Sequence, residues 1–265
     1  MEKVRVFLSD WQVLFREGIH FTLSGEEDFE VIGETTSSEE ALDFIEKNPP
    51  GVAIFNADLG KPSGIDITRR IKQNLPSVII ILVMDSENDE QLFSAMKSGA
   101  SACLSKDIDP NDLVDTIRKV AKGDYPISEA LLRPEIASRV VDEFEASSLI
   151  SEEVGNLLAR LLPAEADILR HLAGGSPIEE ITKALDINEE AIRHNLDLIR
   201  SKLVTNDRSR ELIEAAQSNL PSIISKISKA KVAGRPAAEY ITKDEFAAFK
   251  ESLRERFKSF IGELG

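Results

Sequence analysis

The first 125 residues alternate short apolar runs with helical patterns, and this alternation limits the folds open to the chain. Each run is rich in Val and Ile without a polar side, which is typical of parallel strands buried on both faces. Strands are predicted at 4–8, 29–33, 52–55, 78–84 and 102–104, and helices at 13–24, 38–47, 63–74, 88–98 and 110–122. Five such repeats predict an α/β domain over 1–125, with a doubly wound, five-stranded parallel sheet of the flavodoxin-like kind.

After residue 125 only helical patterns follow. Residues 126–161 are predicted to form a helical connector whose second short helix lies in "SEEVGNLLARLL". Residues 162–215 hold three helical segments, separated by Gly174-Gly175 and by a turn at Asp186. The third opens with Asn188 as its N-cap and is expected to end near Leu203. Three short helices with a tight turn before the last one fit a helix-turn-helix.

The last segment, 216–265, combines a basic arm with a final amphipathic helix at about 243–262. The arm carries Lys226, Lys229, Lys231 and Arg235 with no acidic residue among them. One stripe of the helix is apolar, which predicts a contact with a partner helix, either from a second copy or from the connector of the same chain. The stripe includes Phe246, Phe249, Leu253, Phe257 and Phe260.

Composition narrows the class of protein. The chain has 265 residues, a net charge of −15 and one cysteine, which argues for a reducing compartment and against a disulfide framework. No apolar run approaches the roughly 20 residues that a membrane span needs, and no signal peptide pattern opens the chain, so a cytoplasmic location is predicted. The three histidines are scattered, so no catalytic residues, metal site, cofactor or enzyme activity are predicted.

Four stretches resemble a known family. "SDWQVLFREG" and "SGASACLSKD" resemble two loops of a receiver domain, whereas "LPAEADILRHLAGG" and "INEEAIRHNLDLIRSKL" resemble two helices of a DNA-binding module. Together they resemble response regulators of the LuxR/FixJ (NarL-like) type, over roughly residues 3 to 210. The resemblance implies a receiver, a LuxR-type helix-turn-helix, double-stranded DNA as partner and a homodimer.

In that family, two acidic residues after strand 1 and an acceptor aspartate after strand 3 hold Mg²⁺, a cation that prefers oxygen ligands. A hydroxyl after strand 4 and a lysine after strand 5 hold the phosphoryl group. Only two of these groups are kept, and an aromatic position is also altered. The matching residues are Asp10, Trp11, Asn56, Met84 and Lys106, with Cys103 where an aromatic residue is usual. The resemblance therefore predicts a receiver fold without receiver chemistry. Asp58 is the alternative acceptor.

The same resemblance places DNA contacts on the third helix of the module. The residues expected to face DNA are Ala191, Arg193, His194, Asp197, Arg200 and Lys202. Arg193 is the strongest candidate because its guanidinium can bind guanine with two hydrogen bonds. Asp197 departs from the usual basic or polar residue and would repel phosphate.

Two functions from different classes follow. The first is a transcriptional regulator that binds DNA as a dimer without phosphorylation, controlled by its amount, by a signalling partner protein or by a ligand. The alternative is a signalling protein-interaction module whose DNA reader has decayed, which the acidic charge favours. Salt-dependent binding to DNA separates the two.

Overall fold

The computed structural model describes residues 3–86, 88–148 and 158–232. Its contacts divide the chain into one compact unit, Met1–Leu212, and a second, Ile213–Gly265. The predicted final helix at 243–262, with its Phe246 to Phe260 stripe, lies outside the described residues, as do Arg235 and residues 151–157 of the predicted second connector helix. Among the described residues, none of the helices has both the length and the apolar character needed to cross a membrane.

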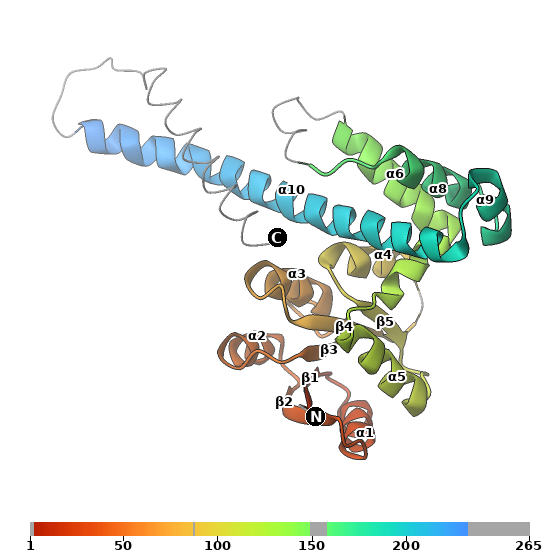
Figure 1. Ribbon diagram of the computed structural model, residues 1–265. Coiled ribbons are helices and arrows are strands. Elements are labelled where there is room, and N and C mark those ends of the chain that lie inside the picture. Colours follow the sequence, from red (N-terminus) through yellow and green to blue (C-terminus); the bar gives the residue numbers. More distant parts are fainter. Residues whose placement is uncertain (1–2, 87, 149–157, 233–265) are drawn as a thin grey trace. The chain divides into compact units, whose positions relative to one another are not determined.

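Five parallel strands form one sheet, as predicted (Figure 1). Their order across the sheet is β2-β1-β3-β4-β5. Strand β2 is added on one side of β1 and the later strands on the other side, so the order of addition reverses between β1 and β3. Ligands of such sheets bind beyond the carboxyl ends of the strands at this switch point. The strands are β1 (Val4–Ser9), β2 (Phe29–Thr35), β3 (Val52–Asn56), β4 (Ile79–Met84) and β5 (Ala102–Ser105).

Helices cover both faces of the sheet. Helices α1 (Val13–Ser24) and α5 (Pro110–Ala121) pack on the face that carries Leu8, Ile54 and Val83. Helices α2 (Ser38–Lys47), α3 (Gly64–Asn74) and α4 (Asp89–Ser98) pack on the other face. Because both faces are covered, the central strands β3 and β4 are apolar apart from Asn56, which is the pattern seen in the sequence.

Gly64 lets α3 begin directly against the end of β3. A Cβ atom at this position would lie 2.1 Å from the carbonyl oxygen of Asn56, so a side chain cannot be accommodated without moving the backbone. Ser63 and Asp66 cap the helix reciprocally, since each side chain accepts from the backbone N–H of the other residue. This packing fixes the loop that follows Asn56.

The helical half begins with the 3₁₀ helix η1 (Pro126–Leu132) and with α6 (Pro134–Ser148). Helices α8 (Pro163–Ala173), α9 (Ile178–Leu185) and α10 (Glu189–Val232) follow. The predicted turn is present at Asp186, whose backbone is left-handed with a φ of 54°. One buried cluster runs from Leu82 in the sheet through Leu131 to Leu203, so the two halves share a core.

The prediction that the third helix of the module ends near Leu203 is wrong. Helix α10 continues to Val232 and passes through the predicted boundary between 215 and 216. Residues 203–212 contain neither Gly nor Pro, so no local signal stops the helix. Lys226, Lys229 and Lys231 of the predicted basic arm therefore belong to this helix.

Candidate functional site

Asp10 and Asn56 meet at the switch point of the sheet. The two residues follow β1 and end β3, and they are only 4% and 1% exposed. Asn56 Nδ2 donates to Asp10 Oδ2 at 3.0 Å, while the backbone N–H of Asp58 donates to Asn56 Oδ1 at 2.7 Å. Because both ends of the amide have a partner, its orientation is fixed.

Lys106 supplies the positive charge at this edge. Its Nζ lies 3.5 Å from Asp10 Oδ2 and 2.5 Å from Asp85 Oδ1. The ammonium also lies 5.4 Å from the ring centres of both Trp11 and Phe15, within range of cation–π attraction. Two carboxylates and two aromatic faces therefore surround a charge that receivers with an acceptor aspartate offer to a phosphoryl group.

The structure does not bring Met84 to this site. In the parallel pairing of β3 with β4, Val83 lies opposite Asn56, and Val83 lines the small space beside Asp10 and Asn56. Neighbouring strand residues point to opposite faces, so Met84 packs on the other side of the sheet. The β4 side chain at the site is thus the apolar Val83, which offers no hydroxyl.

Asp85 and Arg16 are site residues that the sequence did not single out. Asp85 follows β4 and binds Lys106. Its position directly after an apolar strand is the one sequence feature that could have identified it as a site residue. Arg16 donates to the backbone oxygen of Asp10 at 2.9 Å and to Glu34 Oε2 at 3.0 Å. Nothing in the spacing of residues 10, 16 and 34 indicates that contact.

These side chains do not fit a bound Mg²⁺. Among the described residues that line the space beside Asn56, Asp10 is the carboxylate, and both of its oxygens are engaged, Oδ1 by the backbone N–H of Gln12 at 2.7 Å and Oδ2 by Asn56. Trp11 has no oxygen on its side chain and is half exposed. The space between Asp10, Asn56 and Val83 is about 10 Å³, which holds at most one water.

A second group of predicted residues lies at the start of α10. Asn188 caps the helix as predicted, accepting from the backbone N–H of Ala191 at 2.8 Å. Arg193 and His194 are exposed. Arg193 donates to Glu189 one turn before it at 2.9 Å and forms an ion pair with Glu129 of η1. These carboxylates raise the pKa of Arg193, with the hydrogen bond to Glu189 as the main cause.

Arg200 is buried and the ammonium of Lys202 is bound within the protein, so neither charge is arranged for a DNA contact. Arg200 is 7% exposed, and its guanidinium carbon lies 3.8 Å from the ring centre of Tyr125. Burial lowers the pKa of Arg200. Lys202 Nζ binds both oxygens of the fully buried Glu165 at 2.6 and 2.7 Å. The helical period of the sequence could not show that Tyr125 and Glu165, which belong to other parts of the chain, contact these two side chains.

Asp197 and Ala191 are both half-buried. The carboxylate of Asp197 acts on the buried guanidinium of Arg200 and favours its charged form. The acidic residue that departs from the family pattern therefore acts on a positive charge of the protein itself. Of the six predicted DNA contacts, only Arg193 and His194 are exposed.

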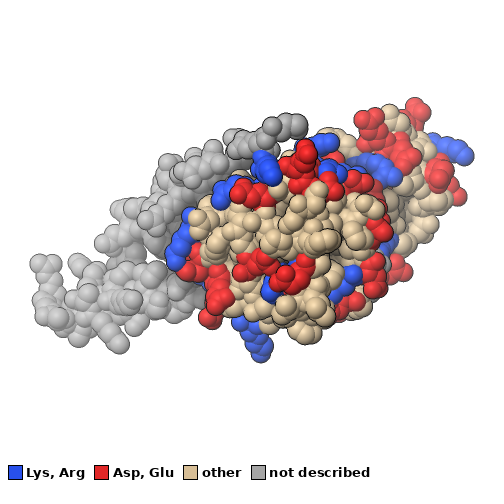
Figure 2. All heavy atoms as spheres, turned by 90° about the horizontal axis from the view of Figure 1, so that it is seen from below, with Lys and Arg blue, Asp and Glu red and all other residues tan. Residues whose placement is uncertain are grey.

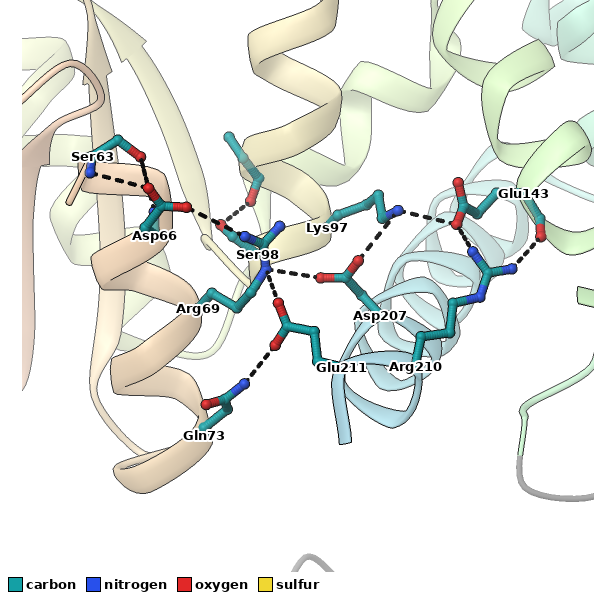
Figure 3. Close-up of polar contacts among 11 residues, drawn as sticks. Ser63, Asp66, Arg69, Gln73, Lys97, Ser98, Glu143, Asp207, Arg210 and Glu211 are labelled. Atoms are coloured by element: carbon teal, nitrogen blue, oxygen red, sulfur yellow. Dashed lines mark hydrogen bonds and ion pairs between the residues drawn. The ribbon is translucent and has the colours of Figure 1, made fainter. Parts of the chain in front are cut away.

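Ion pairs join α10 near Asp207 and Glu211 to helices α3 and α4 of the α/β half (Figure 3). Asp207 binds Arg69 of α3 at 3.0 Å and Lys97 of α4 at 3.2 Å. One turn later, Glu211 binds the same Arg69 at 2.9 Å and accepts from Gln73 at 2.6 Å. Glu143 of α6 is bound by Lys97 at 3.0 Å and by Arg210 of α10. The network joins four helices from both halves of the chain.

The chain is similar to known proteins over most of its length. Residues 6–118 match the response regulator receiver domain family. The chain is 28% identical over 223 residues to the uncharacterised transcriptional regulatory protein YhcZ of Bacillus subtilis, covering 84% of this chain and 100% of that protein. It is 26% identical over 227 residues to the transcriptional regulatory protein DegU of Brevibacillus brevis, covering 82% and 94%.

A solved structure of the RcsB response regulator from Salmonella typhimurium aligns with 77% of this chain and 93% of its own, at 25% identity and a TM-score of 0.45. Residues 6–118 form a receiver domain, in keeping with the family match and the order of the strands. YhcZ and DegU, which each align with more than four fifths of the chain, are transcriptional regulatory proteins.

Proposed function

We propose that this chain is a DNA-binding transcriptional regulator of the response regulator type that works without phosphorylation. The observation that carries the proposal is the exposed pair Arg193 and His194 near the start of α10, directly after the α9 turn. A helix-turn-helix reads base edges with the N-terminal part of its second helix. The relatives named above are transcriptional regulators, which supports the same function.

The second part of the proposal rests on Asn56. An acyl phosphate forms on a carboxylate oxygen, and the carboxamide of Asn56 is not such a nucleophile. Its amide also donates to Asp10, so the two residues form a stable polar pair in place of a cation site. Lys106 forms ion pairs with Asp10 and Asp85. We infer a receiver held in one state by its own side chains.

A homodimer is part of the proposal, because helix-turn-helix proteins bind paired half-sites as dimers. The stripe expected to form the contact, Phe246 to Phe260, lies outside the described residues. Deleting residues 240–265 is expected to lower the mass seen by light scattering from that of a dimer to that of a monomer. An unchanged dimer would place the contact elsewhere.

One observation favours the alternative, a protein-interaction module whose DNA reader has decayed. Arg200 and Lys202 are used inside the protein, and Arg193 is paired with Glu129 and Glu189. On the face shown in Figure 2, acidic and basic side chains are interspersed with uncharged surface and are not gathered by sign. The charges of Arg193, Arg200 and Lys202 are therefore partly or wholly used within the protein, whereas contacts to phosphate are the main source of affinity for DNA.

A fluorescence titration on genomic DNA fragments at several salt concentrations tests the proposal. The full-length chain should bind a subset of fragments, with an affinity that falls steeply with salt. Arg193→Ala should weaken binding about tenfold, as expected for one guanine contact of 1–3 kcal/mol. Arg170→Ala, which removes an exposed arginine from α8, is the matched control. Non-specific binding alone, unchanged by Arg193→Ala, would favour the interaction module.

A further inference from the structure

A hollow of about 410 Å³ lies between α4, β5 and η1, on the sheet face away from Asp10 and Asn56. Its apolar wall includes Met84, Leu92, Cys103 and Ile127. The site described above takes no part in it, because Met84 and Cys103 point to the opposite face of their strands. Pockets of roughly 300–1,000 Å³ are the size that buries a small organic molecule.

The sequence explains part of this space. Cys103 occupies the position on β5 where the resemblance has an aromatic side chain, and its side chain lines the hollow. A cysteine fills far less volume than a phenyl ring. The missing ring and the covering turn of η1 together leave room that side chains of the described residues do not fill.

The charges around the hollow are balanced. Glu129 lines it and forms an ion pair with Arg193, and Arg133 lines it and donates to Asp89 Oδ1 at 2.8 Å. Asn88 and Ser105 add uncharged polar groups. A ligand that carried a net charge would face a wall with no excess of the opposite sign. The chemistry therefore selects a neutral occupant that has both apolar and hydrogen-bonding groups.

We propose that this hollow is a binding site for a small, uncharged molecule with an apolar body and a hydrogen-bonding group. The hollow is directly connected to α10, because Glu129 both lines the hollow and forms an ion pair with Arg193 of that helix. An occupant that moves or desolvates Glu129 changes how firmly Arg193 is held, and DNA must change the affinity for the occupant by the same factor. That coupling rests on the proposed function, whereas the binding site itself does not.

The neutral fluorescent dye N-phenyl-1-naphthylamine is the probe for a titration of the full-length protein without DNA. The expected result is saturable binding with one dye per chain. Cys103→Phe should weaken dye binding at least tenfold, because the ring fills the hollow. Leu14→Phe enlarges a side chain that is 89% exposed on α1, and it should leave dye binding unchanged. Far-UV circular dichroism and thermal melting check that both variants fold.

A second measurement uses the unaltered protein and so does not depend on a variant folding. Cys103 is the one cysteine of the sequence, so alkylation by N-ethylmaleimide can be followed by intact mass. Saturating dye should slow this alkylation at least fivefold. An alkylation rate that the dye leaves unchanged, an absence of saturable binding, or equal dye affinity in folded Cys103→Phe would each overturn the proposal. Loss of DNA binding would leave these results intact and would count only against the proposed function.

Discussion

Asn56 of β3 donates its side-chain amide to Asp10 Oδ2 at 3.0 Å, and this bond joins two strand ends that in a phosphorylated receiver both carry carboxylates. Two buried carboxylates at this distance would repel each other unless a cation lay between them. The amide removes the need for that cation. The pair thus carries one negative charge where two carboxylates would carry two, and it takes the place of a metal site.

Asn56→Asp should therefore lower the free energy of unfolding at pH 7. The variant loses the hydrogen bond and places a second carboxylate beside Asp10, with a cost of about 1–3 kcal/mol. Millimolar Mg²⁺ should return part of this stability, because a ligand that binds the folded state stabilises it. Urea denaturation with and without Mg²⁺ measures both effects.

Asn56→Ala is the control for that experiment. It removes the same hydrogen bond without adding a charge, so Mg²⁺ should not change its stability. If Asn56→Asp proved as stable as the wild type without Mg²⁺, Lys106 alone would be enough to balance two carboxylates, and the interpretation that Asn56 removes the need for a cation would fail.

Incubation with acetyl phosphate and Mg²⁺ should add no phosphate to the wild-type chain, as judged by intact mass. The reason is that Asn56 offers no carboxylate oxygen as an acceptor. Asp58 is exposed two residues later and is the nearest rival, so Asp58→Ala is measured in parallel. A gain in mass that persists in Asn56→Ala and disappears in Asp58→Ala would make Asp58 the acceptor.

Glu129→Gln should strengthen DNA binding by about two- to fivefold. The substitution removes one of two carboxylates that hold Arg193, and exposed ion pairs contribute up to about 1 kcal/mol. Fluorescence anisotropy at fixed salt is the measurement. Glu180→Gln on α9 makes the same change in net charge at an exposed residue, so an equal gain in that control would show a general charge effect.

Arg200 and Tyr125 should be coupled in stability. The guanidinium carbon of Arg200 lies 3.8 Å from the ring centre of Tyr125, and because Arg200 is buried while Tyr125 is partly exposed, we expect a cation–π attraction of about 1 kcal/mol. A double-mutant cycle with Arg200→Met and Tyr125→Leu, followed by urea denaturation, measures the coupling. Additive effects of the two substitutions would show that the stacking adds nothing beyond packing. Arg200→Met alone should affect DNA binding much less than Arg193→Ala.

Lys72→Met should stabilise the chain at pH 7, and the gain should shrink as the pH rises. Burial, with Arg208 and Arg200 nearby, lowers the pKa of Lys72 from 10.5 to about 8. Between pH 8 and 10.5 the unfolded chain binds this proton more tightly than the folded chain, so wild-type stability rises with pH over that range. Below pH 8 the full cost is present. We expect a gain of about 1 kcal/mol, because Lys72 keeps some exposure to water.

Denaturant titrations of wild type and Lys72→Met at pH 7 and pH 10 give the comparison. Lys119→Met on α5, a lysine outside the contact between α3 and α10, is the control. A gain that stayed constant from pH 7 to pH 10 would mean that added apolar packing, and not the buried charge, explains the effect.

Local patterns of the sequence determined the five strands, the helices of the α/β half and the cap at Asn188. Each of these features depends on residues close in sequence, namely apolar runs buried on both faces and a polar residue at a helix start. The sequence also showed that an amide, Asn56, stands at the end of β3. That an amide cannot accept a phosphoryl group as a carboxylate does follows from its chemistry and needs no knowledge of its neighbours.

Only the tertiary structure decided which charged side chains are available. Arg200 and Lys202 share a helix with Arg193, but Tyr125 and Glu165 approach them from other parts of the chain. Likewise, the register of β3 with β4 places Val83 rather than Met84 beside Asn56. Helix α10 extends past Leu203, where Asp207 and Glu211 bind α3. These outcomes depend on residues distant in sequence, so no local pattern could report them.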